Sequence, residues 1–450
     1  MSTKPFWRAT SPLLLLLALL SAAQAQTNAG FTYLITGSTI MINGYTGTVA
    51  SVTIPTNING RTVTSIASGA FYGSSVLTDV TIPSAITNIG TWAFQSCSSL
   101  VRVSIPASIG RIQLGTFDEC NSLESVEIPN GITSIDDQAF LVCSSLTNVI
   151  IPSSVTNIGY AAFEQCFSLT NVTIPNSVRS IGSYAFAWSG LPSVAIPGSV
   201  TNLADSAFQG SDLSTITVPG SITSLQKQTF MDCAYLTNVT LGGGISSIGN
   251  YAFYRCYNLT GAAIPASVTN IGTGAFEECI RLPSLSIPGR LTSLSNYVFE
   301  ECYLLRSVSI PKGLGSIGGL AFYYCTNLSS VFCGGNAPAT GFSPFNWDTQ
   351  VTVYYLPGTT GWSNTLAGVP AVLWNPLARP GGGVVGAQSS QFGFNITGTA
   401  NIPFLVEACT NLACPAWTAL QTLTLTNGSV YFSDSQRTNS PSRFYRIRSP

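Results

Sequence analysis

Phenylalanine recurs along most of this chain at an interval of 23 residues, with two intervals of 22. An Ile-Pro pair keeps the same interval from Ile82-Pro83 to Ile310-Pro311. A single unit of this length cannot bury its own apolar face, so neighbouring units must stack on one another. The period therefore predicts a solenoid with an internal phenylalanine column. The expected members of this column are Phe71, Phe94, Phe117, Phe140, Phe163, Phe186, Phe208, Phe230, Phe253, Phe276, Phe299 and Phe322.

One complete unit shows how a coil is expected to fold. Val149 and Ile151 alternate with outward residues, which is the period of a short strand with one buried face. Pro152 cannot donate to a ladder and ends the pairing. We expect a second short strand at residues 155–158 and one helical turn at residues 161–163. The sequence thus predicts a β-rich solenoid of about 12 coils of 23 residues with short helical turns.

The repeated phrase also resembles a known family. Leu-x-x-Val-x-Ile-Pro, followed by Val-Thr-x-Ile-Gly-x-x-Ala-Phe-x-x-Cys, is similar to the BspA-type leucine-rich repeat of bacterial surface proteins over residues 77–334. The resemblance implies a leucine-rich-repeat solenoid, and in some members adhesion or contact with a host or matrix. The residue after the strand is mostly Ser, Ala or Gly instead of Asn or Cys. The curvature of long horseshoe-shaped repeats is therefore not implied.

The N-terminus has the pattern of an export signal. Lys4 and Arg8 precede an apolar run over residues 13–20, and small residues at Ala23 and Ala25 would permit cleavage before Gln26. Eight consecutive apolar residues are too few to span a bilayer. We therefore expect a signal peptide at residues 1–25, no transmembrane anchor, and a protein that is secreted, periplasmic or at the cell surface.

The remaining boundaries follow from changes in the repeat. Residues 26–76 are expected to form an N-terminal cap and an irregular first coil, because the first Ile-Pro interval is 28 residues. The solenoid is expected at residues 77–334, followed at 335–388 by a turn-rich connector that ends in a glycine-rich linker. Alternating stretches separated by turn residues predict a small antiparallel β module at 389–450.

Composition excludes several function classes. The chain has no histidine, and it has 17 Lys and Arg against 18 Asp and Glu. Histidine is the usual general base near neutral pH and the commonest metal ligand, so triads that contain it cannot be built. A nucleic-acid surface would need clustered positive charge, yet the only lysines after residue 25 are Lys227 and Lys312. We predict that the protein is not an enzyme, has no cofactor and does not bind nucleic acid.

Cysteine follows the repeat and has two interpretations. Nine of the 12 cysteines lie three residues after a column phenylalanine, where Ser74, Ser189 and Ser211 stand in other coils. Exchange with serine favours a buried structural column, with disulfides between neighbouring coils as the alternative. Cys409 and Cys414 lie close together in the C-terminal module and could form a local disulfide.

Two groups of residues are candidate binding sites. Glu277, Glu278, Glu300 and Glu301 occupy matching places in adjacent coils, where a solvated acidic edge is favoured over a calcium site. Tyrosines gather near the Phe-x-x-Cys segments of the later coils, where they could contact a protein or glycan or pack on the rod itself. These tyrosines are Tyr235, Tyr254, Tyr257, Tyr303, Tyr323 and Tyr324.

These observations lead to one functional hypothesis with two alternatives. We expect an exported, monomeric, non-catalytic repeat protein that binds a protein or glycan, in adhesion at or outside the cell surface. The first alternative is a purely architectural envelope or spacer protein without a specific ligand. The second is a secreted carbohydrate-active hydrolase, which the lack of histidine and of an isolated carboxylate pair disfavours.

Overall fold

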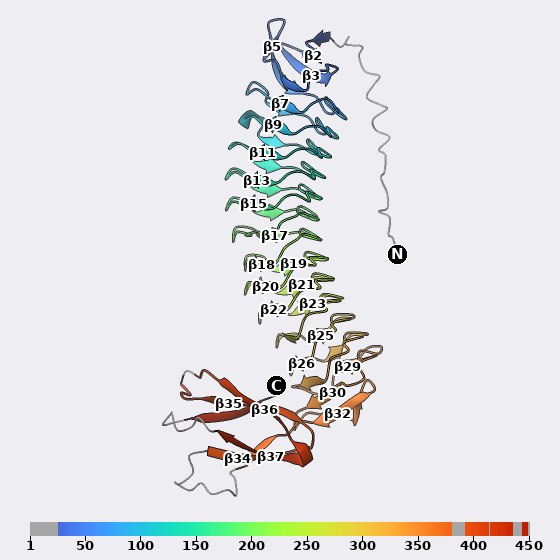
Figure 1. Cartoon of the computed structure of the whole chain (residues 1–450), viewed down its shortest axis with the longest axis vertical. Helices are drawn as coiled ribbons and strands as arrows, with labels where there is room; N and C mark the ends of the chain where they lie inside the picture. The colour runs from blue at the N-terminus through green and yellow to red at the C-terminus, as the bar shows by residue number, and fades with distance from the viewer. Residues whose placement is uncertain (1–25, 380–391, 414, 435–442, 449–450) are drawn as a thin grey trace.

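The chain forms an elongated rod of about 14 turns of roughly 23 residues, with a smaller β module beside its C-terminal end (Figure 1). It is seen in a computed structural model that describes residues 26–379, 392–413, 415–434 and 443–448. The expected signal peptide and the glycine run at residues 381–383 lie outside these described residues. The predicted solenoid architecture is confirmed.

A parallel sheet runs along one face of the rod, with one short strand from most coils. Equivalent residues pair in register, so that Val126 lies beside Val149 and Val149 beside Val172. Their side chains are buried while the flanking residues of the same strands are exposed, as the alternation of a strand requires. The strands are β4 (Ser51–Thr53), β7 (Asp79–Thr81), β9 (Arg102–Ser104), β11 (Ser125–Glu127), β13 (Asn148–Ile150), β15 (Asn171–Thr173), β18 (Thr215–Val218), β20 (Asn238–Leu241), β22 (Gly261–Ala263), β24 (Ser284–Ser286), β26 (Ser307–Ile310), β28 (Ser330–Cys333), β30 (Thr352–Tyr355) and β32 (Val369–Leu373).

A second ladder of two-residue strands lies after the Ile-Pro turn. Each strand except β29 buries an Ile or Leu, and most are followed by a glycine such as Gly159. A Cβ atom at Gly159 would lie only 2.6 Å from the carbonyl carbon of Asp136 in the preceding coil, so stacking requires glycine there. The strands are β8 (Asn88–Ile89), β10 (Arg111–Ile112), β12 (Ser134–Ile135), β14 (Asn157–Ile158), β16 (Ser180–Ile181), β17 (Asn202–Leu203), β19 (Ser224–Leu225), β21 (Ser247–Ile248), β23 (Asn270–Ile271), β25 (Ser293–Leu294), β27 (Ser316–Ile317) and β29 (Ala339–Thr340).

The phenylalanine column is continuous through the core. Neighbouring rings from Phe71 to Phe345 are stacked, with centroid separations of 4.7 to 5.8 Å and interplanar angles of 5° to 17°. These separations lie in the range that favours attraction between aromatic rings. Phe345 was not among the expected members, because no Phe-x-x-Cys phrase accompanies it.

The segments around the column phenylalanines are successive β-turns, in contrast to the expected helical turn. Within residues 92–97, Gln95 N–H bonds to Trp92 O and Cys97 N–H bonds to Phe94 O, whereas the intervening N–H of Ser96 reaches Asp118 O in the next coil. The residues two before and two after each phenylalanine have positive φ, which a right-handed helix does not allow. Among the described residues the helical segments are the short 3₁₀ turns η2 (Ala107–Ile109) and η3 (Thr426–Gly428).

The two ends of the rod are closed differently. At the N-terminal end, β1 (Gln26–Asn28), β2 (Phe31–Thr36) and β3 (Thr39–Tyr45) form an antiparallel sheet that joins β6 (Arg61–Ile66), which pairs in turn with β5 (Asn57–Ile58). Phe31 packs edge-on against Phe71 and so ends the column. At the other end the parallel sheet continues past the expected boundary at residue 334, because β30 pairs with β28 and β32 with β30. A short strand β31 (Thr365–Leu366) pairs antiparallel with β32.

The C-terminal module consists of two three-stranded antiparallel sheets. One contains β33 (Leu377–Arg379), β34 (Phe392–Thr397) and β37 (Ser429–Asp434), and the other contains β35 (Pro403–Cys409), β36 (Thr418–Thr424) and β38 (Phe444–Arg448).

The module packs on the outer face of the last coils. Its core residue Phe404 belongs to the same hydrophobic cluster as Phe332 and Tyr354 of the solenoid sheet. Trp374 donates through Nε1 to Pro403 O at 2.8 Å. Phe332, which the strand period places on the open sheet surface, is therefore buried beneath the module.

Candidate functional site

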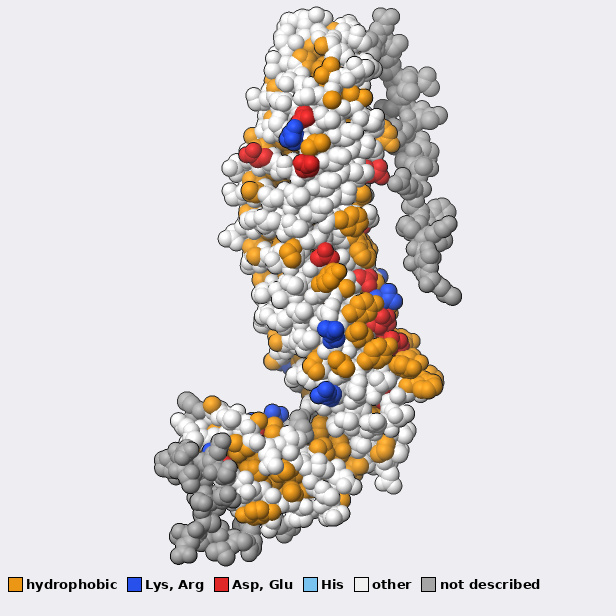
Figure 2. Space-filling model, in the orientation of Figure 1, with side chains coloured by type: hydrophobic (Ala, Val, Ile, Leu, Met, Phe, Trp, Pro, Cys, Tyr) orange, Lys and Arg blue, Asp and Glu red, His pale blue; other side chains and the backbone are white. Residues whose placement is uncertain are grey.

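The most varied surface of the solenoid is the one formed by the residues from two before to five after each column phenylalanine, which we term the turn edge. Alternate N–H groups there bond to the next coil, so the backbone is fixed while several side chains point to solvent. Figure 2 shows hydrophobic and acidic side chains gathered along the right-hand margin of the lower half of the rod. Exposed aromatic residues of the turn edge are Tyr72, Trp92, Phe167, Trp188, Tyr235, Tyr324 and Trp347.

In the later coils two of the expected tyrosines are joined through one of the expected glutamates. The Glu278 carboxylate accepts hydrogen bonds from Tyr254 Oη at 2.9 Å and Tyr257 Oη at 3.3 Å. Arg255 Nε lies 3.1 Å from the same carboxylate, and its guanidinium stacks over the Tyr254 ring at 4.7 Å. These contacts hold two tyrosines and one arginine in fixed positions at the surface.

A second group of contacts lies closer to the C-terminal end of the rod and is mainly aromatic. Tyr303 Oη donates to Glu301 at 2.6 Å, and the Tyr303 ring packs edge-on against Tyr324. Tyr324 also contacts Tyr323 and Trp347, at centroid distances of 5.5 and 6.0 Å. The turn edge thus carries aromatic and acidic residues over five consecutive coils, which we term the late strip (Tyr254 to Trp347).

Burial and like charge change the protonation of the late strip. Partial burial, followed by the carboxylates of Glu300, Glu278 and Glu301, raises the pKa of Glu277 to about 7. Its neighbour Glu300 also has a raised pKa, chiefly because of burial. The hydrogen bond to Glu301, together with burial, raises the pKa of Tyr303 to about 12. The acidic edge is therefore less fully solvated than the sequence suggested.

The expected site residues are only partly brought together. Five of the six tyrosines and the four glutamates belong to the late strip, whereas Tyr235 lies beside a separate hollow nearer the middle of the rod. Two of the four glutamates are engaged by the protein itself, Glu278 by tyrosine and arginine and Glu301 by Tyr303. Within the described part of the chain, no group of three or more His, Cys, Asp or Glu residues is arranged to hold a metal ion.

Several edge aromatics also pack on glycines of the next coil, a relation that the sequence reading missed. A Cβ atom at Gly115 would lie 2.3 Å from Cδ1 of Trp92, and one at Gly274 would lie 2.4 Å from Cε1 of Tyr251. Trp188 covers Gly210 in the same way. All three glycines have positive φ, and each stands one repeat after its aromatic partner. That spacing of aromatic and glycine is the signal that could have revealed these pairs.

The repeat cysteines are structural. Each thiol is buried and donates to the carbonyl oxygen of the phenylalanine in the preceding coil, as Cys143 does to Phe117 at 3.2 Å. Burial raises the pKa of Cys166 to about 12. Where serine takes the cysteine position, the hydroxyl bonds within its own coil, as Ser189 Oγ donates to Phe186 O at 2.8 Å. A deeply buried, hydrogen-bonded thiol with a raised pKa is a poor nucleophile.

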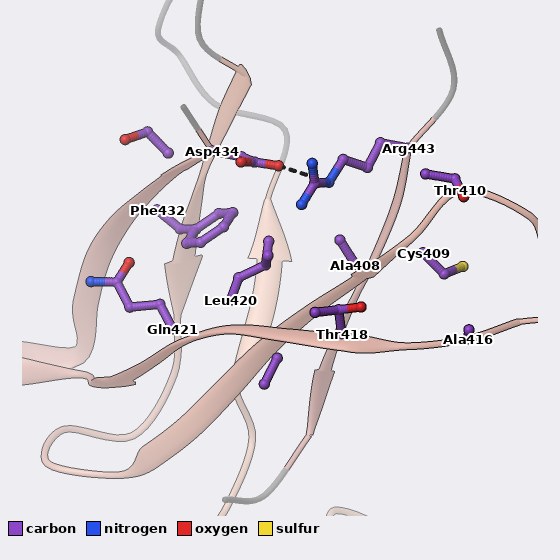
Figure 3. Close-up of a pocket in the computed structure, with 12 residues that line it drawn as sticks. Ala408, Cys409, Thr410, Ala416, Thr418, Leu420, Gln421, Phe432, Asp434 and Arg443 are labelled. Carbon is purple, nitrogen blue, oxygen red and sulfur yellow. Dashed lines mark ion pairs between the residues drawn. The ribbon is translucent and has the colours of Figure 1, made fainter. Parts of the chain in front are cut away.

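The C-terminal module contains a cavity of about 600 Å³ between β35, β36 and β37 (Figure 3). Asp434 and Arg443 form a buried ion pair at its rim, with 3.0 Å between Oδ2 and Nε. Cys409 also lines this cavity, whereas Cys414 lies outside the described residues. The local disulfide between them therefore stays a prediction.

No helix in the described portion of the chain has the length and apolar character needed to cross a membrane.

Comparison with known proteins gives a consistent result. The model of the BspA type leucine rich repeat region matches residues 45–169, 156–282 and 246–359, which together exceed half of the chain. A leucine-rich repeat protein from Bacteroides ovatus is 26% identical, covers 73% of this chain and 99% of its own, and superposes with a TM-score of 0.51. A leucine rich cell surface protein from Faecalibacterium prausnitzii is 28% identical, with coverages of 70% and 96% and a TM-score of 0.49. A search of curated proteins gave no match.

Proposed function

The chain belongs to the BspA-type leucine-rich-repeat family, and from this premise we propose that it is an exported, non-catalytic protein that binds a protein partner through the late strip. Relatives of known structure include a protein described as a cell surface protein. Tyr, Trp and Arg dominate the energetics of protein interfaces, and the late strip supplies all three. The observation that carries the proposal is the Glu278 network, which fixes Tyr254, Tyr257 and Arg255 at the surface.

Two observations, one on the late strip and one on the sheet face, favour binding through the late strip over a purely architectural role. Tyrosines have few rotatable bonds, and here Tyr254 and Tyr303 are also held by hydrogen bonds, so little side-chain entropy remains to be lost on binding. By contrast, the outward positions of the parallel sheet, such as Thr173, Thr217 and Thr240, are small and uncharged. A partner would find few anchoring groups there.

A binding assay with matched variants tests the proposed interface. Purified protein from residue 26 onward would be applied to immobilised extracellular-matrix and bacterial surface proteins. The double variant Tyr324→Ala/Trp347→Ala should weaken binding at least tenfold, because it removes exposed anchors without disturbing the core. Ile150→Ala, which truncates a side chain 62% exposed on the sheet face, is the control and should bind normally. Equal binding by all three proteins would contradict the late strip as the interface, and absence of binding throughout would favour the architectural alternative.

Export is tested separately at the N-terminus. Expression of the full chain in a bacterial host with a general secretion pathway should release a product whose first residue is Gln26, because Ala23 and Ala25 suit the cleaving peptidase. Replacing Leu15 and Leu16 by Arg should retain the protein inside the cell. Secretion of that variant, or an intact N-terminus on the exported product, would contradict the proposed signal.

A further inference from the structure

Two consecutive coils in the middle of the rod are one residue shorter than the others. In the flanking coils two residues separate the cysteine position from the next leucine, namely Phe167 and Ser168 in one and Ala234 and Tyr235 in the other. In the short coils a single residue, Gly190 or Asp212, fills that place. The missing residues therefore fall at the same point of two stacked coils, and the turn edge is recessed there.

The withdrawn edge forms a hollow of about 300 Å³, which we term the notch. Phe167 stands at one end and Tyr235 at the other, with Gly190 and Asp212 between them. A Cβ atom at Gly190 would lie 2.2 Å from Phe167 O, so the floor is backbone that no larger residue could cover without a shift. Because three coil steps of about 4.8 Å separate its ends, the notch is roughly 14 Å long.

The lining combines aromatic rings with carboxylates. Phe167 is 56% exposed, Tyr235 61% and Trp188 39%, so each presents apolar surface to the solvent that fills the notch. Trp188 is held in place against Gly210. Asp212 is exposed, and Asp232 is half-buried with a pKa raised by burial. The lining residues include no Lys or Arg.

The aromatic and acidic residues that line the notch favour some classes of small ligand over others. Two carboxylates disfavour anions, and Arg255, whose charge acts on Asp232, lies outside the lining and is paired with Glu278. A quaternary ammonium would need several rings within about 6 Å of one point, whereas the aromatic residues at the two ends stand roughly 14 Å apart. A pyranose ring complements both the aromatic rings and the carboxylates of the notch, because its C–H face stacks on an aromatic ring and its neighbouring hydroxyls donate to carboxylate oxygens. Pockets of this size hold small ligands that are oriented by a few polar groups.

We propose that the notch binds a short stretch of neutral glycan, with sugar rings on Trp188, Phe167 or Tyr235 and hydroxyl groups on Asp212 and Asp232. The Ser189 and Ser211 hydroxyls at the base already donate to phenylalanine carbonyls, at 2.8 and 2.7 Å, so the carboxylates carry the polar recognition. The notch shares no lining residue with the late strip, although Asp232 lies close enough to Arg255 and Glu278 to interact with them electrostatically. The notch variants below and the interface variants above change different residues, so failure of the glycan site and failure of the protein interface can be told apart.

An array of neutral microbial, plant and mucin-type oligosaccharides, probed with the chain from residue 26 onward, tests the proposal. The best ligand would then be titrated calorimetrically against Tyr235→Ala, Asp212→Asn and Tyr72→Ala. The first two should lower affinity about tenfold or more. Tyr72→Ala, an aromatic 63% exposed on the turn edge far from the notch, should leave it unchanged.

Other results would overturn the assignment. They are the absence of any neutral glycan ligand, a preference for anionic sugars or for choline, and equal affinity in all variants. Release of reducing ends from a bound oligosaccharide would also overturn it, because it would show hydrolysis where only binding is proposed. All four proteins should melt at the same temperature, since each change lies at an exposed side chain.

Discussion

The phenylalanine column and the turn edge are built by the same segments of chain, yet they tolerate very different residues. Phe163 is fully buried between two stacked rings, whereas Phe167, four residues later, stands largely in solvent. Each column position must fill the same space between identical neighbours, so one residue type recurs. At the edge only the backbone is constrained, and the side chains are free to differ from coil to coil. Functional differences between coils therefore belong at the edge.

The sharpest test compares these two phenylalanines. Phe163→Ala should lower the free energy of unfolding by about 3–5 kcal/mol, because it leaves a cavity inside the column. Phe167→Ala should change it by no more than about 0.5 kcal/mol. Chemical denaturation of both variants gives the two values. Similar losses would show that the edge supports the core more than its exposure indicates.

A smaller effect is expected where the edge itself is packed. Gly115→Ala should cost about 2–3 kcal/mol, since the new Cβ both adopts positive φ and meets Trp92. Gly69→Ala occupies the same place in another coil without such a neighbour and should cost about 1 kcal/mol, from backbone strain alone.

Combining Trp92→Ala with Gly115→Ala provides the check. The double variant should recover most of the excess cost, because the clash disappears with the indole ring. If the two effects are simply additive in thermal melting, Trp92 does not pack on Gly115 as described.

The cysteine column should tolerate serine. Cys143→Ser is expected to cost about 1 kcal/mol or less, because a hydroxyl at this place can bond to the phenylalanine carbonyl of its own coil, as Ser189 does. Cys143→Val removes the donor and adds bulk, and should cost about 1–3 kcal/mol. A larger loss for serine than for valine in denaturant melts would contradict the hydrogen-bonded role of this column.

The smallest effect concerns pH and the late strip. The pKa of Glu277 is raised to about 7, so the folded chain holds a proton there more tightly than the unfolded chain does. This group stabilises the fold fully below about pH 4.5, and the contribution is lost as pH rises to about 7. Glu277→Gln should therefore raise the melting temperature at pH 8 by about 1–2 °C while changing it little at pH 4. A variant that melts lower at pH 8 would contradict the raised pKa.

The repeat was readable in advance because stacking imposes its period on the sequence. The spacing of Phe, Ile-Pro and Cys predicted the coil, the buried strand face and the structural cysteines. The prediction of a helical turn at residues 161–163 was wrong. Alternating positive φ values let half of the N–H groups bond to the next coil, and helix propensity does not reveal such hydrogen bonds between coils. Phe345 and the coils beyond residue 334 were missed, because the Cys position there is Asp348 and the Ile-Pro pair is absent.

The candidate sites were predicted less completely. The late tyrosines and glutamates were chosen as candidates from the sequence. The contacts of Glu278 with Tyr254, Tyr257 and Arg255 depend on side-chain directions, which the spacing of residues along the chain does not give. The sequence shows the two 22-residue intervals. The hollow that they produce becomes apparent only when the flanking coils are stacked on the short ones. Tyr235 was grouped with the other late tyrosines for the same reason.

The sequence by itself determined the solenoid, its stacked core and the place of each coil, because every repeat faces the same packing problem and solves it with the same residues. Only the tertiary structure decided which edge residues meet, which aromatics cover glycines, and where two short coils open the notch between Phe167 and Tyr235. Those features depend on contacts between neighbouring coils whose residues differ, and no single repeat contains them.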